Sequence, residues 1–295
     1  MERHRDPSLF EDRRPALLGL AYRILGSKAD AEDAVQDTFL KWDAADQGKI
    51  ENPASWLTTV CTRRCIDLLR AAHRTRVDYV GAWLPEPIHT STEDMSDDSP
   101  ALAASLSTAF LLLLERLTPK ERAAYLLYEI FELSYAEIAT TLGVQETACR
   151  KLVSRARANV DKTSIRHLTP AKRQEELLAA FQSAVTTGRT DELKALMSSD
   201  IELHADGGGR VPTIEEVLHG KADVLAFVSQ DLRKHWAGYQ WIVSGLNGSL
   251  GIILRKEGRT VGSISFGYDE TGNATRIYVV RNPDKLIGLS GFAAS

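Results

Sequence analysis

The stretch from residue 134 to residue 157, SYAEIATTLGVQETACRKLVSRAR, predicts two short helices separated at Gly143. Glycine supplies the backbone freedom that a tight turn between helices needs. Ser134 and Glu137 have the spacing of a capping box at the first helix. Apolar residues recur at helical spacing on one face of each helix, namely Tyr135, Ile138, Ala139 and Leu142 in the first and Ala148, Leu152 and Ala156 in the second. These faces are predicted to pack together as a helix-turn-helix.

The opposite face of the second helix is rich in hydrogen-bond donors. It carries Gln145, Thr147, Arg150, Lys151, Ser154, Arg155 and Arg157. Amide, hydroxyl and guanidinium groups are those that read base edges and bind phosphates, so the pattern favours DNA binding. An ordinary amphipathic hairpin with a solvated basic face would show the same local pattern. The rest of the chain must therefore decide between the two interpretations.

Residues 7–76 have a helical pattern nearly throughout, with a dense acidic cluster and then a basic helix. Acids crowd the helix that begins near Asp30, whereas its macrodipole favours only one or two, by about 0.3–1 kcal/mol each. The excess indicates a basic protein partner. The helix from Ala54 to about Arg74 combines Trp56 with several arginines, which suits melted DNA because bases stack on aromatic rings and phosphates need neutralising. In the alternative interpretation, Trp56 packs in the core and the arginines are solvated.

The whole-chain composition is that of a globular protein of two or three domains, with 295 residues and a formal net charge of -4. The longest apolar run, Ala109–Leu114, is too short to span a bilayer, and the charged N-terminus lacks the apolar segment of a signal peptide. Three cysteines fit a reducing compartment, so we expect a cytoplasmic protein. Cys61 and Cys65 have no partner at metal-ligand spacing and are predicted to be core residues. We expect no metal and no cofactor.

The segment from residue 77 to residue 105 differs from its surroundings. Prolines, acids and low hydrophobicity predict a linker with little fold of its own, in which Trp83 is expected to dock on another part of the protein. Further helices follow, one of them starting at Thr118 with Pro119 and Glu121 in the positions that favour a helix start.

Two helical blocks joined by an acidic linker and ending in a helix-turn-helix resemble a bacterial RNA polymerase sigma factor of the extracytoplasmic-function (ECF) class. The stretch DAEDAVQDTFL from Asp30 resembles that family's polymerase-binding helix. NPASWLTTV from Asn52 and RRCIDLLR from Arg63 resemble its −10 segment, and LTPKER from Leu117, together with the stretch from Ser134 to Arg157, resembles its −35-binding domain. The resemblance implies polymerase contacts by Asp30, Glu32, Asp33, Gln36 and Asp37, −10 contacts by Asn52, Ser55, Trp56, Arg63 and Arg64, and −35 contacts by Gln145, Thr147, Arg150, Lys151, Ser154 and Arg155.

The last 125 or so residues change periodicity. Helical patterns over 171–187, 190–197 and 220–236 accompany strand-like runs at 201–205, 239–246, 249–256, 260–268 and 275–281. Helices combined with a curved antiparallel sheet predict an α+β cone, similar to the SnoaL-like or NTF2-like fold. Enzymes of that fold use an acid–base pair, and by residue type alone the candidates are His204, Asp206, Asp231 and Tyr239. No spacing pairs a base with an acid among them, and fold alone does not carry function.

Two further stretches, Asp206-Gly-Gly-Gly-Arg210 and Asn282-Pro-Asp-Lys-Leu286, would each be predicted as turns on their own. Together with Trp83-Leu-Pro85 they resemble a group of sigma factors with a fused SnoaL-like extension, in which Arg210 replaces the usual lysine. The resemblance implies regulatory contacts by Trp83, Leu84, Pro85, Asp206, Gly207, Gly208, Gly209, Arg210, Asn282, Pro283, Asp284 and Lys285. Docking of residues 206–210 near Trp83 would control the spacing of the DNA-binding domains.

The sequence therefore predicts a multidomain protein: an all-α sigma2 domain at 7–76, an acidic linker at 77–105, an all-α sigma4 domain at 106–165 and an α+β SnoaL-like domain at 170–286. The expected partners are core RNA polymerase and promoter DNA, with a possible small-molecule ligand of the cone, no membrane and no separate anti-sigma protein. Two alternatives stay open. One is a polymerase-independent helix-turn-helix repressor with a ligand-binding cone, and the other is a SnoaL-type enzyme with a DNA-binding appendage.

Overall fold

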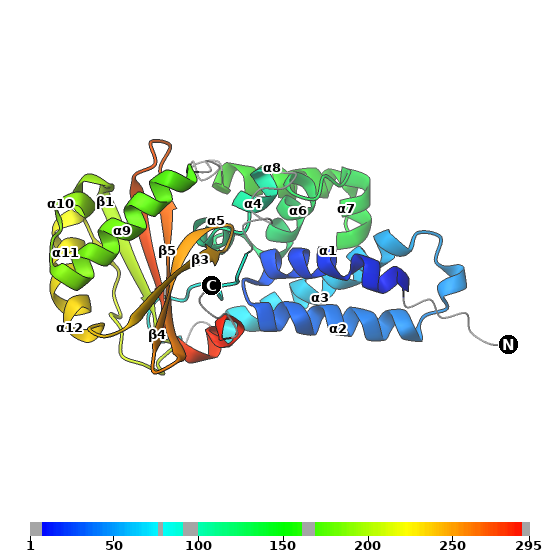
Figure 1. Ribbon diagram of the computed structural model, residues 1–295. Coiled ribbons are helices and arrows are strands. Elements are labelled where there is room, and N and C mark those ends of the chain that lie inside the picture. Colours follow the sequence, from blue (N-terminus) through cyan, green and yellow to red (C-terminus); the bar gives the residue numbers. More distant parts are fainter. Residues whose placement is uncertain (1–7, 76–78, 91–99, 161–168, 291–295) are drawn as a thin grey trace. The chain divides into compact units, whose positions relative to one another are not determined.

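The computed structural model describes residues 8–75, 79–90, 100–160 and 169–290 (Figure 1). The chain divides into two compact units. One combines the described residues up to 75 with those from 113 to 160, and the other combines those between 79 and 112 with those from 169 onward. The division assigns the linker to the unit that contains the sheet.

The first unit is entirely helical. Its N-terminal part comprises α1 (Ser8–Leu25), α2 (Lys28–Ala44), a 3-10 turn η1 (Gln47–Lys49) and α3 (Pro53–Thr75). Its C-terminal part comprises α6 (Pro119–Glu129), α7 (Tyr135–Leu142) and α8 (Glu146–Val160). All three cysteines, Cys61, Cys65 and Cys149, are buried, as predicted for the first two, and no group of metal-ligating side chains occurs in the described residues.

The helix-turn-helix has the predicted starts and turn. Thr118 with Glu121 and Ser134 with Glu137 both form complete capping boxes, and Gly143 has the left-handed φ of 62° that ends α7. The prediction for the packing face of α8 was partly wrong, because Ala148 is exposed. The buried residues of this helix are Cys149, Leu152, Val153, Ala156 and Val160. Their spacing of three and four residues places them on one buried face of the helix, and Ala148 lies outside that face.

The second unit is built on one six-stranded sheet with the order β2-β1-β6-β5-β4-β3. The strands are β1 (Met197–Asp206), β2 (Leu218–His219), β3 (Gln240–Leu246), β4 (Ser249–Lys256), β5 (Arg259–Tyr268) and β6 (Ala274–Val280). The predicted antiparallel sheet is in fact mixed, because β1 pairs parallel with β6. Alternation along a strand does not reveal the direction of a partner that is distant in sequence, and β2 is too short to show a pattern.

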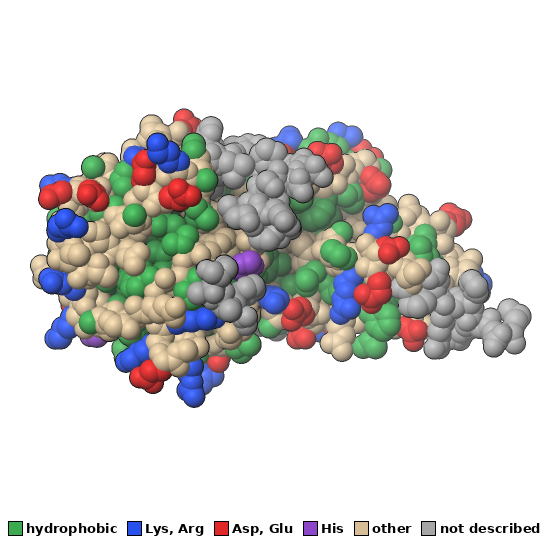
Figure 2. Space-filling view, viewed as in Figure 1, with side chains coloured by type: hydrophobic (Ala, Val, Ile, Leu, Met, Phe, Trp, Pro, Cys, Tyr) green, Lys and Arg blue, Asp and Glu red, His purple; other side chains and the backbone are tan. Residues whose placement is uncertain are grey.

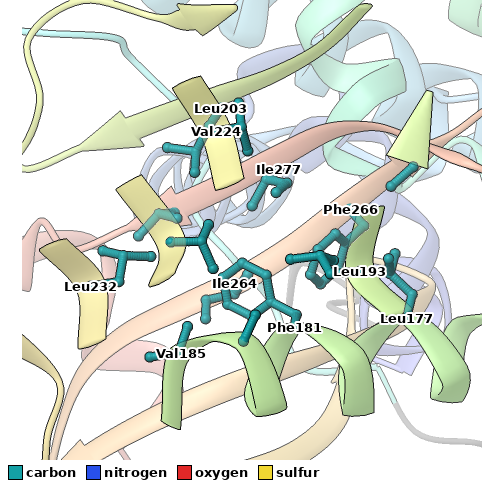
Figure 3. Close-up of a cluster of buried hydrophobic side chains, with 14 of the residues drawn as sticks. Leu177, Phe181, Val185, Leu193, Leu203, Val224, Leu232, Ile264, Phe266 and Ile277 are labelled. Atoms are coloured by element: carbon teal, nitrogen blue, oxygen red, sulfur yellow. The ribbon is translucent and has the colours of Figure 1, made fainter. Parts of the chain in front are cut away.

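Helices cover one face of this sheet: α9 (Ala171–Thr187), α10 (Asp191–Ala195), α11 (Lys221–Ala226), a π-helical turn η3 (Phe227–Leu232) and α12 (Arg233–His235). The second predicted helix, 190–197, ends at Ala195, and the third, 220–236, is interrupted by the π turn. Figure 3 shows Leu177, Phe181 and Val185 of α9 packed among Leu193, Ile264 and Phe266. This cluster is the main core of the unit, and burying it drives the helices onto the sheet.

The opposite face of the sheet is covered by the linker and by the end of the chain. A second apolar cluster contains Leu84, Ala109, Leu246, Ile253, Tyr278, Val280, Leu286 and Leu289. Its members include Ala109 of α5 (Thr108–Leu114) and Leu289 of the 3-10 turn η5 (Ile287–Leu289). Leu286 lies between η5 and the preceding 3-10 turn η4 (Pro283–Lys285), and α4 (Pro100–Ala104) precedes α5. The Thr90 amide donates to the Gly245 carbonyl at 3.0 Å, and the Asn247 amide donates to the Ile88 carbonyl at 3.0 Å. Residues 79–90 are therefore structural elements of this unit, although their composition predicts little structure.

Charged side chains of both signs are mixed on the face drawn in Figure 2, with no large patch of one sign. In the sheet-containing unit they lie mostly at the rim, around hydrophobic and uncharged groups. None of the described helices is both long and apolar enough to cross a bilayer.

Candidate functional sites

The predicted polymerase-binding residues lie along α2. Glu32, Asp33 and Gln36 are exposed, whereas Asp30 and Asp37 are half-buried. A carboxylate oxygen of Asp37 lies 2.6 Å from Nε of Arg64 on α3. This residue therefore helps to hold the two helices together, so its role is partly structural.

Leu40, one turn beyond this acidic group, was missed by sequence reasoning. Its side chain is 57% exposed, in the last part of α2. The signal was present in the sequence, because Leu40 lies outside the inward-facing set of Ala31, Ala34, Val35, Thr38, Phe39 and Trp42. If α2 binds a protein partner as predicted, Leu40 would add an apolar contact beside the acids.

The predicted −10 residues surround the start and the middle of α3. The Asn52 side chain accepts a hydrogen bond from the Ser55 amide at 3.0 Å and so caps the helix. Trp56 is half-buried, with its ring centroid 5.7 Å from that of the buried Trp42. Both interpretations of Trp56 thus hold in part, since one portion of the ring is core and another is accessible.

The six predicted −35 residues, Gln145, Thr147, Arg150, Lys151, Ser154 and Arg155, are all exposed on α8 or directly before it. Nη2 of Arg150 donates to Glu146 at 2.6 Å, and its guanidinium lies 4.3 Å from the ring centroid of Tyr135. Nε of Arg155 lies 3.1 Å from a carboxylate oxygen of Glu121. Arg157 is half-buried and bonded to Glu129. The first two arginines are thus positioned but accessible, whereas Arg157 is anchored to the domain.

Arg63, a predicted −10 residue, is bonded to the helix-turn-helix. Its Nε donates to the Thr141 carbonyl at 2.8 Å and its Nη2 donates to the Thr140 carbonyl at 2.9 Å. The Thr59 and Thr141 hydroxyls share a hydrogen bond of 3.1 Å. These carbonyls lie at the C-terminus of α7, where the helix dipole favours a cation. In this conformation, a predicted −10 residue and the predicted −35-binding domain hold each other.

A second site lies in the sheet-containing unit, where Asp206 at the end of β1 binds the linker. The carboxylate is fully buried and accepts hydrogen bonds from the Tyr79 hydroxyl at 2.6 Å, the Leu84 amide at 2.9 Å and Nζ of Lys285 at 2.7 Å. We call these four residues the linker clasp. A buried carboxylate is tolerated here because a cation and two neutral donors compensate it.

Lys285 completes the clasp by joining both sides of it. Its Nζ also donates to the Leu84 carbonyl at 2.6 Å and lies 4.4 Å from the ring centroid of Trp83. Burial, together with the neighbouring Asp206 carboxylate, raises the pKa of the Tyr79 hydroxyl, so Tyr79 stays a proton donor. Tyr79 was missed in the sequence, where its only signal was an aromatic residue in a polar linker.

The other residues of the three predicted regulatory stretches surround the clasp. Leu84 and Pro85 are buried and Trp83 is half-buried, whereas Pro283 and Asp284 are exposed. Asn282 is buried, and its side-chain amide donates to the Tyr79 hydroxyl at 2.9 Å. Arg210 does not reach the Asp206 carboxylate but forms an exposed ion pair with Asp284 at 3.4 Å. Lys285, rather than Arg210, is the cation of the clasp.

Position 208 favours glycine for two reasons, the backbone conformation there and the close approach of neighbouring atoms. Its φ is 59°, and a Cβ atom there would lie 2.2 Å from Nδ2 of Asn282. We expect Gly208→Ala to destabilise the protein by more than the roughly 1 kcal/mol that a left-handed alanine costs, because Asn282 would also have to move away from Tyr79. The matched control is Gly258→Ala, whose φ of 76° is similar and whose Cβ would meet nothing within 4 Å. Equal losses of Tm in the two variants would show that the packing at Gly208 contributes nothing.

The four candidate catalytic residues are not assembled. Asp206 belongs to the clasp, and Nε2 of His204 lies 3.0 Å from Glu202 with its ring beside Tyr278 on the linker-covered face. Burial lowers the pKa of His204. Only Asp231 and Tyr239 line a common cavity, which lies on the helical side of the sheet.

Comparisons with known proteins agree with this architecture. The Sigma-70 region 2 family matches residues 9–75, and the Sigma-70 region 4 family matches residues 107–160. The chain belongs to the ECF RNA polymerase sigma factors. These are alternative sigma factors, which direct transcription initiation and are not enzymes.

Among its relatives, the ECF RNA polymerase sigma factor SigJ of Mycobacterium tuberculosis is 32% identical over 95% of this chain and 93% of its own. The probable ECF RNA polymerase sigma factor SigI of the same species is 30% identical over 97% of each chain. The crystal structure of SigJ superposes with a TM-score of 0.75 at 30% identity and covers 96% of this chain and 99% of the other. The similarity therefore includes the C-terminal sheet domain as well as the helical part.

Proposed function

We propose that this sigma factor binds core polymerase through the acidic face of α2, the −10 element through α3 and the −35 element through α8. The exposed donors of α8 support the last assignment, because none of its six predicted reading residues is consumed by the core. The protein would act in the cytoplasm, where its polymerase is. Regulation of the helical domains would not require a separate anti-sigma protein, since the C-terminal domain that would regulate them is covalently attached.

The observation that carries the regulatory part of the proposal is the burial of the Asp206 carboxylate against the linker. The linker joins the two DNA-binding domains in sequence, so a domain that grips it restricts how those domains can separate. Tethering gives the contact a high effective concentration, and weak bonds then suffice to bias a conformational equilibrium. The C-terminal domain would thus control the sigma factor in cis, with a small molecule as a possible input.

The test is run-off transcription from the organism's genomic DNA with purified core polymerase and the full chain, followed by mapping of the RNA 5′ ends. We expect a common upstream sequence at the start sites. Arg150→Ala is expected to cost about 1–3 kcal/mol at one position of the −35 element if the guanidinium is bidentate to guanine. The control is Arg157→Ala on the same helix, which should change stability rather than sequence preference. An unchanged preference in Arg150→Ala would remove that residue from the reading surface, and a failure of the full chain to bind polymerase would overturn the proposal.

A further inference from the structure

The sheet-containing unit has a cavity of about 480 Å³ between the sheet and the helices that follow β2. Its floor includes Leu203 and Ala205 of β1 and Val279 of β6, and its opposite wall includes Phe227, Leu232 and Trp236. This volume lies within the range of roughly 300–1,000 Å³ that is typical of small-molecule sites, and an apolar lining with few polar groups is typical of them as well.

The helical wall has an unusual backbone. Phe227, Asp231 and Leu232 all belong to the π-helical turn η3, which interrupts the helix between α11 and α12. A π turn is less favourable than a regular helix and often occurs at functional sites. Here it places three side chains at the cavity, and its Val228 and Leu232 also belong to the main core.

Aromatic side chains shape one end of the cavity. The rings of Trp236 and Tyr239 are stacked, with an interplanar angle of 19° and centroids 6.5 Å apart, and Phe227 also lines the cavity. Flat aromatic walls pack best against a flat, apolar ligand body.

The polar groups indicate the charge of that ligand. Nη1 of Arg281 donates to the Pro212 carbonyl at 3.3 Å, while its buried Nε has no hydrogen-bond partner within the part of the chain that the structure describes. An unsatisfied buried guanidinium N–H favours an acceptor, and a negative one most strongly. The other ionisable side chains of the lining, Asp231 and His235, are exposed, and the His235 Nδ1 is hydrogen-bonded to the Asp231 carbonyl at 2.7 Å.

From this geometry we propose that the cavity binds a planar aromatic anion, with its ring system against Phe227 and Trp236 and its acidic group at Arg281. The cavity and the linker clasp share backbone. The Arg281 amide donates to the Asp206 carbonyl at 2.7 Å, and the loop from Gly207 leads directly to Pro212, Thr213 and Ile214 in the cavity wall.

The loop between the two sites is tightly packed. A Cβ atom at Gly207 would lie 2.4 Å from the Val211 carbonyl and 2.9 Å from the Thr213 hydroxyl, so Gly207 is in close contact with the cavity wall. Through this contact we expect occupancy of the cavity to alter the clasp. This second statement rests on the proposed control in cis, whereas the binding itself does not.

The test uses two fluorescent probes that share one ring system. The anion 8-anilinonaphthalene-1-sulfonate and the neutral N-phenyl-1-naphthylamine are titrated into the full chain. We expect the anion to bind about tenfold more tightly, because only it offers a charged acceptor to Arg281. Arg281→Gln should remove that preference and leave binding of the neutral probe intact, while Arg259→Gln, at an exposed arginine outside the cavity lining, should change neither.

A second variant locates the probe. Ile214→Trp fills the cavity and should weaken both probes, with a thermal melt by circular dichroism to verify folding. If that variant does not fold, the two arginine variants still decide the question. Equal affinity for the two probes in the unaltered chain, or an anion preference that survives Arg281→Gln, would overturn the assignment of the site.

The link to the clasp is measured by hydrogen–deuterium exchange of residues 79–90 with and without the anionic probe. We expect the exchange of the segment containing the Leu84 amide to change on binding, and Asp206→Ala to abolish that change. Tight anion binding with unchanged exchange would refute the coupling between cavity and clasp, but the proposed anion site would still stand. Unaltered transcription in Asp206→Ala would refute the control in cis alone.

Discussion

Oxidation of a Thr59→Cys/Thr141→Cys variant is expected to abolish promoter-directed transcription, and reduction is expected to restore it. The Thr59 and Thr141 hydroxyls are 3.1 Å apart, so two cysteines at these positions are close enough for a disulfide after small adjustments. The bond would hold α3 against α7 as in this structure.

The reason for the loss is geometric. The −10 and −35 elements lie about 25 base pairs apart, which is roughly 85 Å at 3.4 Å per base pair. In this structure, Arg63 of the predicted −10 surface is hydrogen-bonded to Thr140 and Thr141 of the helix-turn-helix. With the proposed assignment of α3 to the −10 element and α8 to the −35 element, two domains held in direct contact cannot occupy both elements at once. We therefore expect α7 and α8 to leave α3 before the promoter is engaged.

We expect at least a tenfold drop in run-off transcript for the oxidised variant. The single variants Thr59→Cys and Thr141→Cys serve as controls, treated with the same oxidant. Oxidation should be confined to the introduced pair because Cys61, Cys65 and Cys149 are buried. Normal transcription by a fully cross-linked protein would mean that α3 and α7 stay together on the promoter.

Asp206→Ala is expected to have the largest effect on the C-terminal unit. Removing the carboxylate leaves Lys285, whose side chain is 13% exposed, without its counter-ion, and leaves the Tyr79 hydroxyl and the Leu84 amide without their acceptor. Breaking one side of a buried ion pair typically costs about 3–5 kcal/mol. The linker should therefore be released, and transcription should change severalfold relative to the unaltered chain.

The control for Asp206 is Asp284→Ala, because Asp284 is exposed and pairs only with the exposed Arg210 among the described residues. Such a surface pair is worth little, so neither stability nor transcription should change measurably. Adding Lys285→Met to Asp206→Ala should recover part of the lost stability, since the cation that has lost the Asp206 carboxylate would be removed. Equal melting temperatures for Asp206→Ala and Asp284→Ala would contradict the central role of the clasp.

The helix-turn-helix and its flanking helix could be predicted in detail because their signals are local. Ser134 and Glu137, or Thr118 and Glu121, interact across three residues, and Gly143 acts through its own φ. The face of α8 was harder to predict. Alanine spacing alone placed Ala148 inward, whereas the buried stripe begins at Cys149 and is decided by where α8 meets α6 and α7.

The clasp was predictable only in outline. Resemblance identified the three stretches that meet there, but Arg210 was expected to take part and Tyr79 was not. Which of two nearby cations faces Asp206 depends on the path of the backbone after β6, and the motif does not encode that path. The same holds for the parallel pairing of β1 with β6, which joins strands far apart in the chain.

The amino-acid sequence by itself determined the order of the helical domains, the helix caps and the donor-rich face of α8, because these depend on interactions within about one helical turn. Only the tertiary structure decided that Arg63 binds the end of α7, that Lys285 neutralises Asp206 and that the linker is part of the sheet domain. These contacts join residues 77 or more positions apart. Which partners meet over such distances is settled by how the core packs, and a pattern along the chain does not specify it.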